Sequence, residues 1–140
     1  MNDRYLYRAK RKNWREFPKE MWWIEGYYAY FKQNDNHCIY YETDGFTLVC
    51  DIDISTLCAC TGLKDKNGKL IWENNVVGFL DTYSTENGQA EMDCIGKVVW
   101  DDETISFQVT NRLSAESYEV LDECSVIGNI FDNPELLESE

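Results

Sequence analysis

The chain of 140 residues has one histidine, His37, and lacks the usual motifs of catalytic sites. His37 follows a polar loop, so a nucleophilic Ser-His-Asp or Cys-His site is not expected. No P-loop and no G-x-G-x-x-G stretch is present, which argues against the common nucleotide-binding folds. These absences predict a protein without catalytic residues and without a cofactor.

Long apolar runs are also missing. No stretch approaches the roughly 18 to 20 apolar residues that span a membrane. The first eight residues lack the apolar region of a secretory signal. We therefore expect a cytoplasmic protein with no membrane partner.

The six cysteines lack the spacing of a zinc site. The closest pair is Cys58 and Cys60, whereas zinc ligands usually arrive as C-x2-4-C pairs. Residues two apart on a strand point to one face, which suits a buried pair. A cytoplasmic setting keeps thiols reduced. The sequence favours free, buried cysteines over disulfides or structural zinc, and it predicts no metal site.

Acidic residues are abundant, 26 against 13 basic ones, and the net charge is −13. Residues 1–20 differ, with seven basic and three acidic side chains, a net +4; the other 120 residues carry six basic and 23 acidic ones, a net −17. A field of that sign repels nucleic acid, which is therefore not the expected partner. Instead, Arg8, Lys10 and Arg11 are expected to bind acidic protein surface, in this chain or in a neighbouring subunit.

Short apolar runs predict a mainly β fold, with a barrel or a rolled sheet. Strands are predicted at 22–31, 37–41, 46–50, 57–63, 69–72, 76–83, 95–100, 105–110 and 125–131. Residues 84–91 are predicted to form an exposed loop, and 115–121 remain ambiguous between strand and helical turn. Gly26, inside an aromatic run, indicates a bulge or close packing.

Turn residues punctuate these strands. Asp44-Gly45 predicts a hairpin turn, and Asn67-Gly68 predicts a type I′ turn with both residues at positive φ. Asn133-Pro134-Glu135 has the order of an N-cap followed by the first helical residues, which predicts one short C-terminal helix.

Two patterns suggest other functions. Asp51 and Asp53, with Asp101-Asp102 further on, resemble the motifs of haloacid-dehalogenase-type phosphatases, where paired carboxylates bind Mg²⁺ and attack phosphate. Because helical periodicity is nearly absent, a magnesium-dependent phosphatase stays a remote alternative. Residues 1–31 hold ten aromatic residues among seven basic ones, a composition that suits single-stranded nucleic acid. The other interpretation is that these rings form the core or cross-strand pairs.

Two longer segments resemble a known family. Residues 61–77 (TGLKDKNGKLIWENNVV) and 126–137 (VIGNIFDNPELL) are similar to the central and C-terminal signatures of the YopX family of phage and prophage proteins. YRAKRK at 7–12 and WIEGY at 23–27 look like that family's start. The family usually has Gly-Asp at Asn74-Asn75, where Asn also suits a turn, and Gly at Ala9. Residues 14–21 look like an insertion.

The resemblance implies an SH3-like small β-barrel in the C-terminal half, about 61–131, with a preceding β-rich region packed against it. The expected domains are thus 1–60 and 61–140, ending in the short helix and forming one compact unit. It also implies a phage or prophage protein in the cytoplasm of a bacterial host, and it supplies no activity.

We therefore expect a non-enzymatic accessory protein that binds a host or phage protein of basic character, or associates with itself. Nucleic-acid binding through the basic aromatic segment, and acidic mimicry of DNA, are the alternatives. Small SH3-like barrels present grooves to peptides, and Trp72, Tyr83 and Trp100 are the aromatic candidates for such a groove.

Overall fold

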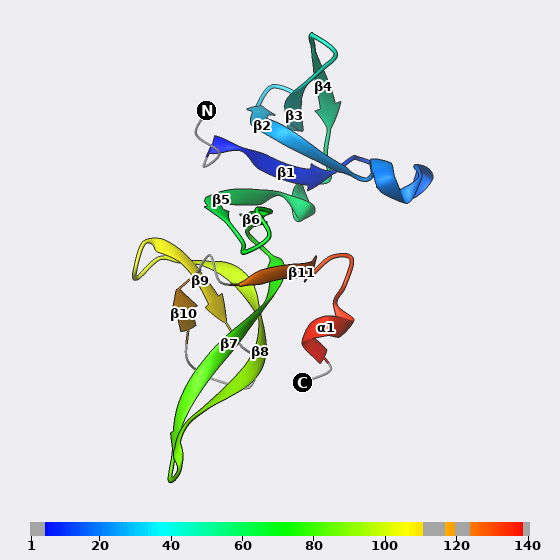
Figure 1. Ribbon diagram of the computed structural model, residues 1–140. Coiled ribbons are helices and arrows are strands. Elements are labelled where there is room, and N and C mark those ends of the chain that lie inside the picture. Colours follow the sequence, from blue (N-terminus) through cyan, green and yellow to red (C-terminus); the bar gives the residue numbers. More distant parts are fainter. Residues whose placement is uncertain (1–4, 111–116, 120–123, 139–140) are drawn as a thin grey trace. The chain divides into compact units, whose positions relative to one another are not determined.

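The computed structural model describes residues 5–110, 117–119 and 124–138, without the side chains at 81–83, 117–119 and 138 (Figure 1). The chain divides into two compact units, unit 1 (Met1–Gly62) and unit 2 (Leu63–Glu140). Each unit has a hydrophobic core of its own. The described residues form antiparallel strands, short 3₁₀ helices and one short α-helix, which confirms the prediction of a mainly β fold.

Unit 1 is an antiparallel sheet in the order β4-β3-β2-β1-β5. Its strands are β1 (Tyr7–Lys10), β2 (Trp23–Phe31), β3 (Asn36–Thr43), β4 (Phe46–Asp51) and β5 (Cys58–Lys64), the last of which runs past the unit boundary. The 3₁₀ helices η2 (Trp14–Glu16) and η3 (Lys19–Met21) connect β1 to β2, and η4 (Ile54–Thr56) connects β4 to β5.

The core of unit 1 is one face of this sheet. Its buried residues are Ala9, Ile24, Ile39 and Ile52, with tyrosine side chains packed around them. Gly26 lies at a close approach of β2 and β3, because a Cβ atom there would overlap the carbonyl oxygen of Tyr40. The predicted close packing at this glycine is confirmed.

The end of β4 turns onto the end of β1. Arg11 and Ile52 form an isolated antiparallel bridge. The Lys12 N–H donates to the Asp51 carbonyl at 2.9 Å, and the Asp53 N–H donates to the Lys10 carbonyl at 2.9 Å. These bonds curl the sheet at one corner, while the rest of β4 stays its outer strand.

Unit 2 holds a second antiparallel sheet, in the order β10-β9-β8-β7-β11. Its elements are β6 (Leu70–Trp72), β7 (Asn75–Thr85), β8 (Gly88–Asp101), β9 (Ser106–Thr110), β10 (Ser117–Glu119), β11 (Ser125–Asn129) and α1 (Glu135–Glu138). The core contains Ile71, Val77, Val98, Val109 and Cys124. Among the described residues the outer strands β10 and β11 do not pair, so the SH3-like barrel is not confirmed.

The expected loop at 84–91 is wrong. β7 and β8 form a long hairpin that continues to the pair Thr85–Gly88 (Figure 1). A two-stranded ribbon can have both faces in water, so its polar residues do not mark the end of a strand.

The turn at residues 65–69 also differs from its prediction. Only Gly68 has positive φ, 80°, because the Asp65 carboxylate organises the chain differently. Its Oδ1 accepts the N–H groups of Asn67 and Lys69, both at 2.9 Å, which gives a turn followed by one left-handed glycine. The Asp44-Gly45 turn is confirmed, with φ of 50° and 81°.

The C-terminal helix is confirmed as α1, whose first turn begins with a bond from the Leu136 N–H to the Asn133 carbonyl at 3.1 Å. The Asn133 side chain accepts from the Asn129 N–H instead, at 3.2 Å. It lies against Gly128, where β11 has a register shift opposite β7.

Candidate functional site

The predicted binding residues Arg8, Lys10 and Arg11 lie on β1 and directly after it. Lys10 is 2% exposed, and its Nζ lies 3.7 Å from the ring centroid of Trp14, 4.6 Å from that of Trp22 and 5.5 Å from that of Trp23. We call Lys10 and these rings the tryptophan cage. An ammonium over aromatic faces is favourable by about 0.5 to 2 kcal/mol, and more so away from water.

Further cations cover the same rings. The guanidinium of Arg8 lies 4.2 Å from the Trp23 ring centroid, and that of Arg15 lies 4.1 Å from the Trp14 centroid. Arg11 donates from Nε to the Met21 carbonyl at 2.7 Å. Helices η2 and η3 therefore contribute rings and a carbonyl to the cations of β1. Since the rings already carry cations of the same unit, they are not bare platforms for nucleic-acid bases.

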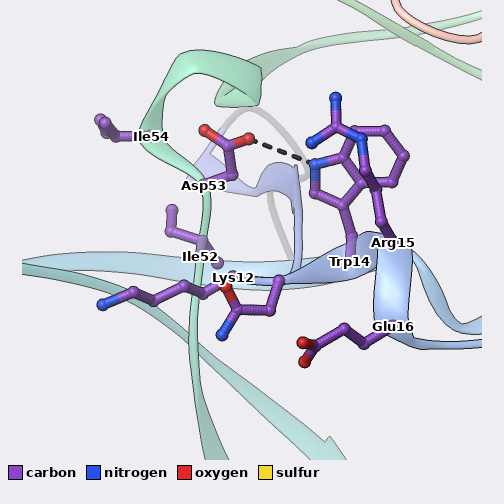
Figure 2. Close-up of a pocket in the computed structure, with 8 residues that line it drawn as sticks. Lys12, Trp14, Arg15, Glu16, Ile52, Asp53 and Ile54 are labelled. Carbon is purple, nitrogen blue, oxygen red and sulfur yellow. Dashed lines mark hydrogen bonds between the residues drawn. The ribbon is translucent and has the colours of Figure 1, made fainter.

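A pocket of about 480 Å³ lies beside the cage (Figure 2). It is lined by Lys12, Asn13, Trp14, Arg15, Glu16, Ile52, Asp53 and Ile54. The Arg15 side chain lies along the Trp14 ring, and Lys12 extends in a different direction. Two cationic side chains, Lys12 and Arg15, and two carboxylates, Glu16 and Asp53, line it, so their formal charges balance.

Asp53, a member of the phosphatase-like pattern, forms hydrogen bonds with Trp14 and Ser55 of unit 1. Its Oδ2 accepts from Trp14 Nε1 at 3.2 Å, and its Oδ1 accepts from the N–H and the hydroxyl of Ser55 at 3.1 and 2.6 Å. The hydroxyl bond from Ser55 is the largest cause that lowers the pKa of Asp53, against a smaller opposing effect of burial. Asp51 accepts from Asn36 Nδ2 at 3.0 Å.

The second acidic pair of the phosphatase-like pattern, Asp101 and Asp102, lies in unit 2. Asp101 accepts from the Glu103 N–H at 3.0 Å, and Asp102 accepts from Trp100 Nε1 at 2.8 Å. Among the described residues, no three or more His, Cys, Asp or Glu side chains gather as a metal site. Over the same residues, no helix has the length and apolar character to cross a membrane.

Of the three aromatic groove candidates, Trp72 is buried and Trp100 is exposed. Trp72, the last residue of β6, is 3% exposed. Trp100 is exposed and meets the Phe107 ring edge-on at 5.0 Å. The Tyr83 side chain lies outside the described part of the structure. All six cysteines are in the thiol form; five are buried and Cys50 is half-buried.

Exposed apolar side chains that sequence reasoning missed lie on the outer strand β4 and on β2, over both faces of the sheet. The exposed fraction is 69% for Phe46, 42% for Leu48 and 56% for Val49. On β2, Tyr27, Tyr30 and Phe31 are also exposed. We call these six residues the β4 edge surface.

On the outer side of β4, alternate backbone N–H and C=O groups point away from β3. The Asp51 carbonyl points away from β3, since it accepts from Lys12 N–H. In an antiparallel ladder, alternate residues turn their N–H and C=O groups the same way. The backbone groups of Thr47 and Val49 therefore also point outward, whereas Phe46, Leu48 and Cys50 bond to β3. The register with β3 runs unbroken from Phe46 to Asp51.

β4 lacks several of the usual protections of an edge strand. Its sequence, FTLVCD, has no proline and no lysine, and it has no bulge opposite β3. Natural sheets commonly use such devices, because an open edge is a template for pairing with another chain. β4 is therefore suited to strand addition.

The sole histidine lies nearby, at the start of β3. His37 stacks between two tyrosines of β2, with ring centroids 4.6 Å from Tyr30 and 5.9 Å from Tyr28. Its Nδ1 is 2.6 Å from the Tyr28 hydroxyl. Tyr30 donates to Asp35 at 2.8 Å, and this bond is the largest cause that raises the pKa of Tyr30. These contacts fix the β2–β3 hairpin that carries the surface.

These features describe a mainly β protein of two units with an open, apolar sheet edge. The model of the YopX protein family matches residues 7–138, so the chain belongs to the YopX family. No curated protein matches it. A similar solved structure is that of protein EF1440 from Enterococcus faecalis, with 19% identity, a TM-score of 0.48, and coverage of 95% of this chain and 96% of that one.

The two segments that resemble the family signatures meet inside unit 2. Asp65 Oδ2 accepts from the Val126 N–H at 2.9 Å, and the Asn74 carbonyl accepts from the Ile130 N–H at 3.0 Å. Asn74 has φ of 69°, a conformation that glycine adopts more easily. Asn75 Oδ1 accepts from the Trp72 N–H at 2.8 Å, as an aspartate carboxylate also would. These contacts give the signature residues a structural role.

Proposed function

We propose that this chain is a non-enzymatic recognition protein that binds another protein through the β4 edge surface. The observation that carries the proposal is the outward backbone of Thr47 and Val49, flanked by exposed apolar side chains on both faces of the sheet. Strand addition to such an edge combines main-chain hydrogen bonds with side-chain contacts. A phage or prophage setting in a bacterial cytoplasm is part of the proposal and rests on the family.

The test is affinity capture from bacterial lysate, with wild type and the Thr47→Pro variant compared. The Thr47 N–H points outward, so proline removes a donor that the partner needs and leaves the β3 ladder intact. Leu80→Lys is the matched control, since Leu80 is 60% exposed on β7. We expect Thr47→Pro to lose a stoichiometric partner that wild type and Leu80→Lys retain. Equal capture by all three folded proteins would refute the proposed surface.

Self-association through the same edge is the second form of this function. Sedimentation equilibrium then gives a dimer for wild type and a monomer for Thr47→Pro. A monomer in both cases excludes self-association as the function of β4.

Acidic mimicry of nucleic acid is a second candidate, favoured by the separation of charge. Unit 1 carries eight basic and nine acidic residues, a net −1, and unit 2 carries five basic and 17 acidic ones, a net −12. Mimicry requires that the chain competes with DNA for a DNA-binding protein, whereas direct binding through the basic segment requires affinity for single strands that falls steeply with salt. Fluorescence anisotropy with labelled single-stranded DNA separates the two.

Two further proposals concern the SH3-like barrel in unit 2 and a phosphatase activity. An SH3-like barrel in unit 2 requires β10 to meet β11, and nuclear Overhauser contacts between Ser117–Glu119 and Ser125–Asn129 test that closure. A phosphatase requires Asp51 as nucleophile, and a purified activity that Asp51→Asn abolishes would establish it against the non-enzymatic proposal.

A further inference from the structure

We propose that the β4 edge accepts an extended peptide in which apolar and basic residues alternate. This inference rests on the proposed recognition function and adds the chemistry of the ligand. Only Thr47 and Val49 offer outward N–H and C=O groups clear of the bond to Lys12. The core of the bound peptide is therefore short, with residues placed opposite Thr47, Leu48 and Val49.

One face of the edge is apolar. In an antiparallel pair, directly opposed residues point to the same face of the sheet. A peptide residue opposite Leu48 therefore lies on the face of Leu48 and Phe46, beside Tyr41, which pairs with Leu48 on β3. Leu48 and Phe46 are 42% and 69% exposed, so an apolar peptide side chain covers surface that is otherwise in water.

The other face carries two acidic residues beside Val49 and Tyr40. Thr47 pairs with Glu42 on β3, and Asp51 follows Val49 on the same face. A lysine opposite Thr47 can extend over that short side chain to Glu42, and one opposite Val49 lies diagonal to Asp51. Residues 33–63 contain five acidic residues and neither lysine nor arginine, and the nearest cationic residues, Arg11 and Lys12, lie at the Cys50–Ile52 end of β4, away from Glu42.

The same charges disfavour a second copy of the chain as the occupant. A symmetric antiparallel pair of β4 strands, with Leu48 opposite Leu48, uses the outward groups of Thr47 and Val49 in both copies. It also places Asp51 of one copy opposite Gly45 of the other, next to Asp44. Like charges at both ends of so short a ladder oppose the pairing.

The test uses two soluble probe peptides, one of alternating lysine and valine and one of alternating glutamate and valine. Binding to the full chain is followed by amide chemical shifts, with Thr47 and Val49 as reporters. We expect the lysine peptide to shift both amides, more weakly in high salt, and the glutamate peptide to leave them unchanged. Glu42→Lys should weaken the lysine peptide about two- to five-fold, whereas Glu91→Lys, with the same charge change on β8, should not.

The other outcomes overturn the inference in distinguishable ways. Equal binding of both peptides at β4 refutes the charge selection and leaves strand addition standing. Shifts of Thr47 and Val49 that follow protein concentration alone identify a second copy as the occupant. If neither peptide binds, the inference fails, and the Thr47→Pro capture decides separately whether the recognition function fails too.

Discussion

The substitution Asp65→Asn tests whether one buried carboxylate holds unit 2 together. Asp65 is 5% exposed and accepts three backbone N–H groups at 2.9 Å, from Asn67 and Lys69 on Oδ1 and from Val126 on Oδ2. An asparagine oxygen can still serve the first two. Its amide nitrogen then faces the Val126 N–H, so two donors meet and the β11 contact is lost.

The cost follows from that geometry. A buried donor without an acceptor costs about 1 to 3 kcal/mol, and charge-assisted bonds are stronger than neutral ones, so the expected loss is about 2 to 4 kcal/mol. For a unit of this size, 1 kcal/mol corresponds to about 4 to 8 °C in Tm. We expect Asp65→Asn to lower the melting temperature of unit 2 by roughly 10 to 25 °C.

The pH dependence gives an independent check. Burial alone would raise the pKa of Asp65, but the hydrogen bonds from Val126, Lys69 and Asn67 outweigh it and lower the pKa below its ordinary value. The stability that the carboxylate contributes is therefore complete above the unfolded pKa, about 4, and is lost as the pH falls through the folded pKa. The gap between wild type and Asp65→Asn should be full at neutral pH and shrink in acid.

Thermal unfolding followed by circular dichroism measures both effects. Glu91→Gln, an exposed carboxylate of the same unit, is the control and should change Tm by no more than about 2 °C. A Tm of Asp65→Asn equal to that of Glu91→Gln, or a loss of Tm that is the same in acid as at neutral pH, would contradict this role of the Asp65 carboxylate.

Three further substitutions test the packing. Trp14→Ala removes the ring nearest to the buried Lys10 ammonium and should lower the free energy of unfolding in urea by about 3 kcal/mol or more. Lys10→Met removes the charge and keeps the length of the side chain, so it should lower the free energy of unfolding by about 1 kcal/mol or less. The reverse order would contradict the tryptophan cage. Gly26→Ala should destabilise unit 1 by at least about 2 kcal/mol, because its Cβ overlaps the Tyr40 carbonyl, and an unchanged urea midpoint would disprove that close approach. Asn75→Ala removes the acceptor of the buried Trp72 N–H and should lower the free energy of unfolding by about 1 to 3 kcal/mol. Asn75→Asp keeps an acceptor oxygen and, as the control, should retain wild-type stability.

Local signals in the sequence predicted much of the fold. The Asp44-Gly45 turn and the Asn133-Pro134-Glu135 helix start depend on residues within one turn of chain, and both are confirmed. The turn at Asn67-Gly68 was predicted with the wrong conformation, since the side chain of Asp65 takes the N–H groups that define it. A turn prediction from Asn67 and Gly68 alone does not take account of hydrogen bonds to a nearby side chain.

Long-range arrangement accounts for the rest. Residues 7–10 read as a charged segment, yet they form β1, which pairs with β2 and β5, and the rings of Trp14, Trp22 and Trp23 surround the Lys10 ammonium. The strand predicted at 46–50 is confirmed as β4, Phe46–Asp51. Its position at the edge of the sheet follows from the order of strands, which local sequence does not contain, and so the β4 edge surface could not be predicted.

The most direct test of the recognition proposal is amide hydrogen exchange at Thr47 and Val49, measured in the free chain and in complex with the captured partner. Both amides point outward, so they should exchange quickly in the free chain and slow strongly on binding, while the inward amides of Leu48 and Cys50 stay slow throughout. Unchanged exchange at Thr47 and Val49, with new protection on other strands, would contradict strand addition at β4.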